Sequence, residues 1–319
     1  MDKYRRVVKA LKKYNNFLIT SHINPEGDSI GSQLAFAYLL KALGKKTCIV
    51  NAHKPGHRYS FLPKVSSILT KIKKDKKYDA ICFLDCGDIR RIGRIYEEID
   101  LSKPTINIDH HLSNTGFGDI NLVLPRASST GEILYRLFKK AKVKINKDAA
   151  VCLYTAILTD TGSFSYSNTT SFTHKLVSCL IDIGIDVEKI YKKVYEEVSQ
   201  STMQLLGKAL STLKLSENGA IAWIKITKKM LKESKASLED EENFVNFPRS
   251  IKGVRVAMLF TEIANNKTKV SLRSNDIIDT NEIASHFVGG GHKKASGCLI
   301  KGKLPDAEKK MLSVIKKYI

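Results

Sequence analysis

The stretch FLITSHINPEGDSIGSQLAFAYLLKALG, residues 17–44, joins a short apolar run to a helical pattern through a polar loop. Its first five residues predict a buried strand, and residues 29–43 predict a helix that ends at a glycine. The loop between them contains His22, Glu26 and Asp28 among turn-forming residues. This loop has three possible interpretations: a metal site, a phosphate-binding loop, or a polar turn with no further role.

Further apolar runs in the first half of the chain predict strands at 47–52, 80–85 and 105–109. Helical patterns follow at 129–141, 147–159 and 171–183. Strands separated by helices are typical of a parallel α/β sheet. We therefore expect residues 1–185 to form a parallel-sheet α/β domain.

The second half of the chain has a different pattern, with strands predicted at 221–226, 254–263 and 268–274 and few helices between them. Helical patterns appear at 280–287 and 306–318. The segment 186–215 is largely helical in pattern, and we expect it to link the two halves. Residues 216–319 are then predicted to form a second, smaller α/β domain.

The chain is strongly basic, with 53 Lys and Arg against 32 Asp and Glu and a formal net charge of +21. Such a charge attracts polyanions, although scattered lysines are also typical of a Lys-rich proteome. The six cysteines include no CxxC pair, which favours a reducing compartment. No signal peptide or membrane-length apolar run is present, so we expect a cytoplasmic protein that does not associate with membranes.

Polar residues follow three of the predicted strands in the first half. His22, Glu26 and Asp28 follow the first, Asp85 ends another, and Asp109, His110 and His111 end the last. Asp160 follows an apolar helical run. Because ligands bind beyond the carboxyl ends of parallel strands, we expect these side chains to converge. Mixed carboxylate and imidazole ligands favour Mn²⁺, and their number suits two ions that act on a phosphate ester.

Each of these residues also has a purely structural interpretation. A single histidine after a strand is often a packing residue, and Asp28 has the position of a helix N-cap. Pro25 and Gly27 are ordinary turn residues. The phosphate-loop interpretation is weak because neither GxxxxGK[ST] nor GxGxxG is present.

Four segments in order resemble the motifs of the DHH phosphoesterase superfamily: SHINPEGDSIGS, FLDCGD, NIDHHLSN and ILTDTGSFSYSNTT. GGGHKKASG, residues 289–297, resembles the signature of the associated C-terminal domain. The pattern is most similar to the short, stand-alone nanoRNase type. That resemblance implies hydrolysis of short oligoribonucleotides to nucleoside monophosphates and of 3′-phosphoadenosine 5′-phosphate to AMP.

The resemblance also implies roles for individual residues. One ion would be held by His22, Glu26 and Asp85, and a second by Asp28, Asp85, His110 and Asp160. The ions would be Mn²⁺, with Mg²⁺ or Co²⁺ as substitutes. His111 would face the phosphate, and Asp109 would orient the histidines that follow it. Relatives commonly have Asp where this chain has Glu26, which puts the metal preference of that site in doubt.

Substrate contacts are predicted in both halves. In the first half, Arg126 precedes a helix start at which Ser129 and Glu132 have the spacing of a capping box. In the C-terminal domain the candidates are Arg273, Ser274, Gly289, Gly290, Gly291 and His292. The glycine run suits an approach of main-chain N–H groups to an anion, and its alternative is a tight turn.

Two other functions fit the same motifs. One is a phosphodiesterase for cyclic di-AMP or its linear product pApA, and the other is a nucleotide-binding protein without catalysis. The predicted partners are short RNA and small nucleotides. The sequence leaves the oligomeric state open, a homodimer included.

Overall fold

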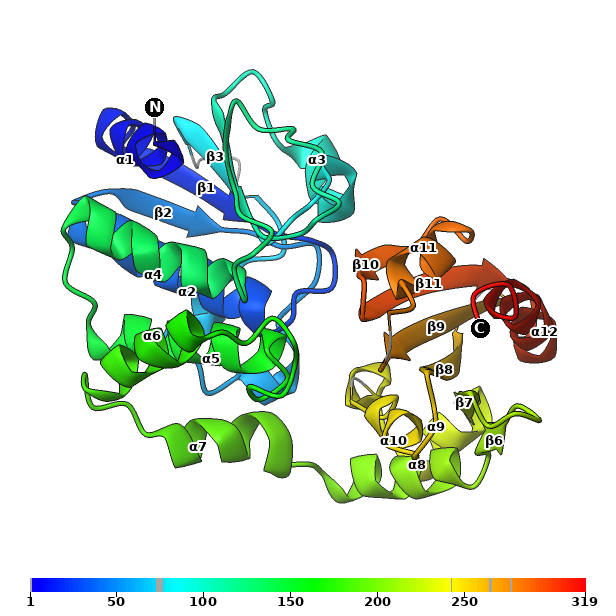
Figure 1. The fold of residues 1–319 in the computed structure, drawn as a ribbon. Helices are drawn as coiled ribbons and strands as arrows, with labels where there is room; N and C mark the ends of the chain where they lie inside the picture. Colours follow the sequence, from blue (N-terminus) through cyan, green and yellow to red (C-terminus); the bar gives the residue numbers. More distant parts are fainter. Residues whose placement is uncertain (1, 73–76, 242, 264–265, 276) are drawn as a thin grey trace. The chain divides into compact units, whose positions relative to one another are not determined.

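The computed structural model describes residues 2–72, 77–241, 243–263, 266–275 and 277–319. The chain divides into two compact units, Met1–Glu197 and Val198–Ile319 (Figure 1). The boundary falls inside the 186–215 segment that the sequence predicts to be helical. Short helical pieces lie on both sides of it, at Val187–Tyr191 (α7) and Gln200–Leu210 (α8).

The N-terminal unit is built on a five-stranded sheet in which every neighbouring pair is parallel. Its order is β2-β1-β3-β4-β5. The strands are β1 (Asn16–Thr20), β2 (Lys46–Ile49), β3 (Ala80–Leu84), β4 (Thr105–Asp109) and β5 (Ile120–Val123). The longer helices are α1 (Lys3–Lys13), α2 (Gly27–Ala42), α4 (Thr130–Ala141), α5 (Lys147–Asp160) and α6 (Ser171–Ile181). The predicted parallel α/β class is confirmed.

Alternate side chains of each strand enter different hydrophobic cores, because successive residues of a strand point to opposite faces. Phe17 and Ile19 pack with the core that α2, α4 and α5 cover. Leu18, between them, packs on the other face, together with Ile95 of the short helix α3 (Ile95–Glu98). The sheet is therefore covered on both faces, as parallel sheets require.

The strand order reverses direction between β1 and β3. The chain leaves β1 through α2 to reach β2 on one side, and it leaves β3 through α3 to reach β4 on the other. At such a switch point the two connections diverge and leave a crevice beyond the strand ends. The residues that follow β1 and β3 are therefore placed at one crevice.

Glycines allow α2 and α5 to pack very closely beside this crevice. A Cβ atom on Gly27 would lie 2.5 Å from the Thr159 side chain, and one on Gly31 would lie 2.4 Å from the Cys152 carbonyl oxygen. No larger residue fits at these contacts without a shift of the neighbour. This close approach brings the start of α2 next to the end of α5.

The C-terminal unit is built on a six-stranded sheet of order β10-β11-β9-β8-β7-β6, in which only β7 and β8 pair in parallel among the described residues. The strands are β6 (Lys214–Leu215), β7 (Ile221–Ile226), β8 (Val256–Ile263), β9 (Lys267–Ser274), β10 (Gly290–His292) and β11 (Ala295–Lys301). Helices α11 (Thr280–Ser285) and α12 (Leu304–Ile315) cover one face. Helices α8, α9 (Lys228–Ser234) and α10 (Asn246–Arg249) cover the other.

Some elements differ from the prediction. Four strands were not predicted: β5 and β6 are short, β10 is rich in Gly, and β11 begins with Ala-Ser-Gly. Helix α1 was also missed, although Val7, Ala10 and Leu11 give it a buried stripe at helical spacing. Within the described part of the chain, no helix combines the length and apolarity needed to cross a bilayer.

Candidate active site

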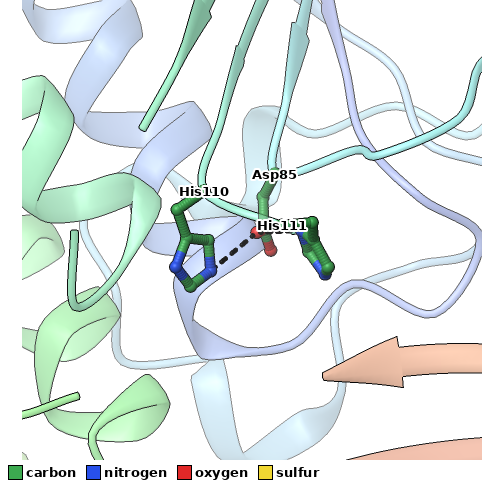
Figure 2. A group of neighbouring side chains, drawn as sticks. All are labelled: Asp85, His110 and His111. Carbon is green, nitrogen blue, oxygen red and sulfur yellow. Dashed lines mark ion pairs between the residues drawn. The ribbon is translucent and has the colours of Figure 1, made fainter. Parts of the chain in front are cut away.

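Asp85 lies directly after β3, at the centre of a group of histidines. One of its carboxylate oxygens lies 3.6 Å from His22 Nε2, and the other lies 3.7 Å from His110 Nε2 and 3.6 Å from His111 Nδ1. Figure 2 shows the carboxylate between the rings of His110 and His111. The backbone of Asp85 is left-handed, with φ 54°. Non-glycine residues rarely adopt this conformation except where the surrounding structure imposes it.

The histidines determine the charge of Asp85. Burial alone would raise its pKa, but the hydrogen bond to His22 and the charges of His111 and His110 outweigh burial. The pKa of Asp85 is therefore held well below its usual value. Asp85 is a buried carboxylate that stays ionised.

His110 lies among three carboxylates that come from different elements. Its Nε2 atom is 3.4 Å from Asp160, 3.7 Å from Asp28 and 3.7 Å from Asp85. Its Nδ1 atom is 3.2 Å from the carbonyl oxygen of Ala127. That carbonyl accepts the Nδ1 proton and leaves Nε2 to face the carboxylates, which is the orientation expected of a metal-binding imidazole.

Asp28 is held by the start of helix α4. Its two oxygens accept hydrogen bonds from the main-chain N–H groups of Thr130 at 2.7 Å and Gly131 at 2.9 Å. Ser32 donates a third bond at 2.9 Å, and the Thr130 hydroxyl donates to Asp85 at 3.2 Å. A helix N-terminus has unpaired N–H groups and a partial positive charge, so it suits a carboxylate. Asp28 is therefore not a simple N-cap of its own helix, where Glu26 has the cap position.

The buried carboxylates repel each other and disturb each other's protonation. Burial and the charges of Asp85 and Asp160 raise the pKa of Asp28 well above its usual value. Burial, opposed by His110, raises the pKa of Asp160 to about 6. Burial would lower the pKa of His110, but Asp160, Asp28 and Asp85 raise it to about 9. The metal-free site therefore holds protons that a cation would replace.

His111 belongs to a second hydrogen-bonded chain. Its Nδ1 atom lies 2.7 Å from Asp109 Oδ1, and Asn114 donates to Asp109 Oδ2 at 2.5 Å. Asn114 also donates to the side chain of Asn107 at 2.8 Å. Burial would raise the pKa of Asp109, but His111 lowers it overall. An ionised Asp109 fixes the proton on Nδ1 of His111 and makes Nε2 the ring atom that can accept a proton or bind a ligand.

Asn168 connects the end of α5 to the loop before α4. Its side-chain amide donates to the carbonyl oxygens of Ser128 at 2.9 Å and Asp160 at 3.0 Å. The Ser128 main chain and hydroxyl both donate to the buried Glu132 carboxylate, at 3.0 and 2.8 Å. This network ties the loop that orients His110 to the element that carries Asp160.

The donor set fits divalent cations. Asp85, His110 and His111 form one group, and Asp28, His110 and Asp160 another, each with ligand atoms within 4.8 Å of one another. Ligands about 2.1 Å from an octahedral ion stand about 3 Å apart when adjacent and about 4.2 Å when opposite. Oxygen and imidazole donors without a thiolate suit Mn²⁺ or Mg²⁺ more than a soft ion. Mutually repelling buried carboxylates also require a positive charge.

The two remaining predicted ligands, His22 and Glu26, differ from each other in burial. His22 is buried, and Asp85 is its neighbour. Glu26 is exposed at the start of α2, and its side chain makes no capping hydrogen bond. Its charge is nevertheless near enough to raise the pKa of Asp160. Glu26 therefore lies at the border of the site, on the solvent side.

The predicted features around Arg126 lie at the start of α4. Ser129 caps this helix by accepting from the Glu132 N–H at 3.0 Å, as the sequence indicated. The second half of the capping box is absent, because the Glu132 side chain binds Ser128. Arg126 is exposed in the loop before the helix. Two N–H groups of the helix start are already bonded to Asp28.

The predicted substrate residues of the C-terminal unit gather at one end of its sheet. Ala295 pairs with Arg273 on one side and with the main chain of His292 on the other. The side chain of His292 lies outside the described part of the structure. Arg273 is half-buried, and its Nη1 donates to the carbonyl oxygen of Leu272 at 3.0 Å. Ser274 is buried at the end of β9.

The glycine run forms a strand and not an open loop. Gly290 and Gly291 belong to β10, and the Gly291 N–H donates to Asn281 at 2.9 Å. A Cβ atom on Gly289 would lie 2.4 Å from the carbonyl oxygen of Gly297. These contacts give Gly289 and Gly291 structural roles. The Gly291 N–H is bonded to Asn281 within the domain, and the approach of the glycine N–H groups to an anion stays a prediction.

Four residues that organise the site were not predicted: Asn107, Asn114, Thr130 and Asn168. Asn107, Asn114 and Asn168 stand within the motif segments, so their position was a usable signal. Thr130 follows Ser129 and gave no comparable signal, because its partners Asp28 and Asp85 are distant in sequence.

Comparisons with known proteins find one domain family in each half of the chain. Residues 16–157 match the model of the DHH family, N-terminal domain, and residues 218–319 match the DHHA1 domain. A bifunctional oligoribonuclease and PAP phosphatase NrnA from Thermus thermophilus is 29% identical over 100% of this chain and 95% of its own length. A Bacillus subtilis protein of the same name is 27% identical over 92% of each chain. The crystal structure of an exopolyphosphatase-related protein from Bacteroides fragilis has a TM-score of 0.91 and 31% identity, and covers 99% of this chain and 96% of its own.

Proposed function

This chain belongs to the DHH family, and on that premise we propose that it is a metal-dependent phosphoesterase that acts on short RNA. It hydrolyses short oligoribonucleotides to nucleoside monophosphates, and it converts 3′-phosphoadenosine 5′-phosphate to AMP. The names of the Thermus and Bacillus relatives, which align over nearly the whole chain, support both activities. The proposed site of action is the cytoplasm.

The observation that carries the proposal is the convergence of buried carboxylates around His110 and of histidines around Asp85. The three carboxylates within 3.7 Å of His110 Nε2 come from α2, from α5 and from the residue directly after β3. A structural role for these side chains is a poor explanation, because buried carboxylates without a cation repel each other. A metal centre for hydrolysis explains their number, their burial and the left-handed backbone of Asp85 together.

In this proposal Asp28, Asp85, His110 and Asp160 hold one Mn²⁺ ion, and His22, Glu26 and Asp85 hold another. Bound ions of this kind generate a hydroxide nucleophile near neutral pH and neutralise charge on a phosphoryl group. The N-terminus of α4 orients Asp28 and favours its ionised form, against burial and the neighbouring carboxylates. The side-chain amide of Asn168 bonds the carbonyl oxygen of Asp160, and the carbonyl oxygen of Ala127 orients the ring of His110.

His111 is the proposed catalytic acid or charge stabiliser. Asp109 accepts its Nδ1 proton, so the Nε2 atom is the one available to a phosphate or a leaving oxygen. The rigid link from Asn107 through Asn114 to Asp109 limits the rotation of the imidazole. The proposed nucleotide contacts in the C-terminal domain are Arg273 and Ser274 at the end of β9 and His292 in the adjacent β10 hairpin. The proposed contact in the N-terminal domain is the exposed Arg126.

A substrate panel tests the proposal. A labelled RNA dinucleotide, 3′-phosphoadenosine 5′-phosphate and pApA are incubated with the protein in Mn²⁺, Mg²⁺ or Co²⁺, and products are separated by chromatography. We expect mononucleotide release from the dinucleotide and AMP from the second substrate, with Mn²⁺ most effective. Faster turnover of pApA would assign the enzyme to linear products of cyclic dinucleotides.

Two variants test the role of Asp85, and the second is the matched control. Asp85→Ala removes the carboxylate shared by the three histidines and should abolish hydrolysis. Asp88→Ala removes a carboxylate three residues later, which pairs with Arg90 at 2.6 Å and lies outside the histidine cluster. It should retain activity. Folded wild-type protein that releases no mononucleotide with any of the three metals contradicts the proposal.

A further inference from the structure

A second basic site lies between helices α1 and α4 of the N-terminal unit. These helices pack against each other, and a cavity of ≈ 480 Å³ opens between their exposed edges. Five of its six lining side chains are cationic: Arg5, Lys9, Lys12, Lys140 and Lys142, with Val8 as the sixth. We call this cavity and its five cations the α1–α4 groove.

The charges of the groove are poorly balanced by the protein itself. Lys140 pairs with Asp2 at 3.3 Å. Among the residues that the structure describes, no ion pair is formed by Arg5, Lys9, Lys12 or Lys142. Arg5 and Lys9 are four residues apart on one helix face, and like charges at that spacing destabilise a helix. Like charges that converge on a cavity are explained by an anionic ligand.

The groove is remote from the metal site. Helix α4 begins at Thr130, whose N–H donates to Asp28, and Lys142 is its C-terminal cap. With a rise of about 1.5 Å per residue, this helix separates the two ends by about 18 Å. A ligand at the groove is therefore distinct from a phosphate held beside Asp28.

Basic residues near helix C-termini have a simpler explanation, because they complement the helix dipole. That explanation suits Lys12, Lys13, Lys139 and Lys140, which lie in the last turns of α1 and α4. It does not apply to Arg5, which lies in the first turn of α1 at the positive end of that dipole. The charge of Arg5 contributes, with Lys140, to lowering the pKa of Asp2, but this is one carboxylate against the five cations of the groove.

The shape and composition of the groove favour one class of polyanion. A helix that lies on a membrane buries a broad apolar face, whereas Val8 is the one apolar residue that lines this groove. A nucleic-acid backbone presents phosphates in series to spaced cations and needs no apolar contact. Arg5, Lys9 and Lys12 supply such a series along α1.

We propose that the α1–α4 groove binds the phosphodiester backbone of single-stranded RNA, independently of sequence and separately from the metal site. The choice of RNA rests on the proposed function, since RNA is the polymer from which short oligoribonucleotides arise. The groove lets the enzyme stay on RNA that is too long to be its substrate. A dinucleotide is too short to reach the groove from the metal site.

Binding of a fluorescein-labelled 20-nucleotide single-stranded RNA, measured by fluorescence anisotropy in EDTA, tests the groove without cleavage. Lys9→Gln/Lys12→Gln removes two groove cations with little change in helix propensity. Each phosphate contact contributes a slope of about 0.7 in log affinity against log salt. We expect the slope to fall by about 1.4 and the affinity to fall about 25-fold at 0.1 M salt.

Lys41→Gln/Lys175→Gln is the matched control. Both lysines are exposed on helices of the same unit, so the net charge changes equally. The control should bind RNA as the wild type does, and both double variants should hydrolyse the dinucleotide at the wild-type rate. An equal loss of RNA binding in both variants overturns the proposal, because it would show a response to net charge alone.

A third arm distinguishes RNA from a membrane. The wild type and Lys9→Gln/Lys12→Gln are also mixed with phosphatidylserine vesicles. The RNA assignment is overturned if the wild type binds the vesicles and the double variant loses vesicle binding but binds RNA as the wild type does. Absence of RNA binding by the wild type in EDTA also overturns it. Hydrolysis of the dinucleotide is a separate readout, so a failed proposed function and a failed groove are recognised independently.

Discussion

The main-chain N–H of Thr130 donates a 2.7 Å hydrogen bond to Oδ2 of Asp28. The two residues are 102 positions apart in the sequence, and the bond places a helix N-terminus against a buried carboxylate. It favours the ionised form of Asp28, whose pKa is otherwise raised by burial and by neighbouring carboxylates. The protein therefore uses main-chain dipoles to orient a carboxylate that we propose as a metal ligand.

Thr130→Pro tests this bond, because Thr130 is the first residue of α4 and follows an extended Ser129. Proline is well tolerated at this helix position but has no N–H. Thr130→Ala is the control, since both variants lose the hydroxyl that donates to Asp85 and only proline loses the N–H. We expect Thr130→Pro to bind Mn²⁺ about 10- to 100-fold more weakly than Thr130→Ala, as measured by calorimetry. Equal affinities would contradict the role given to the N–H.

The left-handed backbone of Asp85 predicts a difference between two inactive variants. Asp85→Gly and Asp85→Ala both remove the carboxylate, but glycine adopts φ 54° without strain and alanine does not. We expect the glycine variant to be more stable by about 1 kcal/mol in urea denaturation with EDTA. Both should lack hydrolase activity. Equal stability of the two variants would show that the backbone at residue 85 relaxes when the carboxylate is removed.

Asp109→Asn tests the orientation of His111. The amide can still hydrogen-bond His111, but it can present its N–H₂ group to Nδ1 and so allow the wrong tautomer. We expect the turnover number to fall about 10²-fold or more, while Mn²⁺ stoichiometry is unchanged. Asn114→Ala, which loosens Asp109 without changing its charge, should lower turnover less. Loss of a metal ion in Asp109→Asn would instead make Asp109 part of the metal site.

The stability of the metal-free protein should fall as pH rises above mildly acidic values. Asp160, with its pKa raised to about 6 from 3.8, contributes stability that is present below pH 3.8 and lost as pH rises through 6. His110, raised to about 9 from 6.5, contributes stability that is present below pH 6.5 and lost as pH rises through 9. Asp85 and Asp109, whose pKa values are lowered, contribute stability above pH 3.8 that is lost in more acidic solution.

Urea denaturation in EDTA between pH 4 and pH 9 measures this dependence. We expect the free energy of unfolding to be highest at mildly acidic pH and to decline toward pH 9. Saturating Mn²⁺ should remove most of the decline, because the cation replaces the protons. Asp160→Asn should flatten the curve in EDTA between pH 4 and pH 6. A free energy of unfolding that rises from pH 5 to pH 9 without metal would contradict these charge states.

The sequence predicted the parallel sheet well because its strands are short apolar runs with clear ends, such as residues 80–84 and 105–109. It also placed Asp85 and His110 in one site, since strand ends of a parallel sheet share an edge. Asp160 ends a helix, and the family resemblance assigned it to the site. The contacts of Thr130 and Asn168 could not be predicted. They depend on how closely α2, α4 and α5 pack, which is set by glycine contacts between distant segments. The strand formed by Gly290 and Gly291 was missed for a related reason, because its pairing with β11 outweighs low strand propensity.

Glu26→Asp tests the position at which the resemblance to the DHH superfamily leads us to expect Asp. Glu26 has the N-cap position of α2 but makes no side-chain cap bond, whereas aspartate is among the best N-cap residues. We expect Glu26→Asp to stabilise the metal-free protein by about 0.5–1 kcal/mol, to retain hydrolysis, and to change the ratio of Mn²⁺- to Mg²⁺-supported turnover. Glu26→Gln, which removes the charge without improving the cap, is the control. If Glu26→Asp is folded but inactive, the pocket requires the longer side chain, and the second ion depends on the reach of Glu26 from the solvent side of the site.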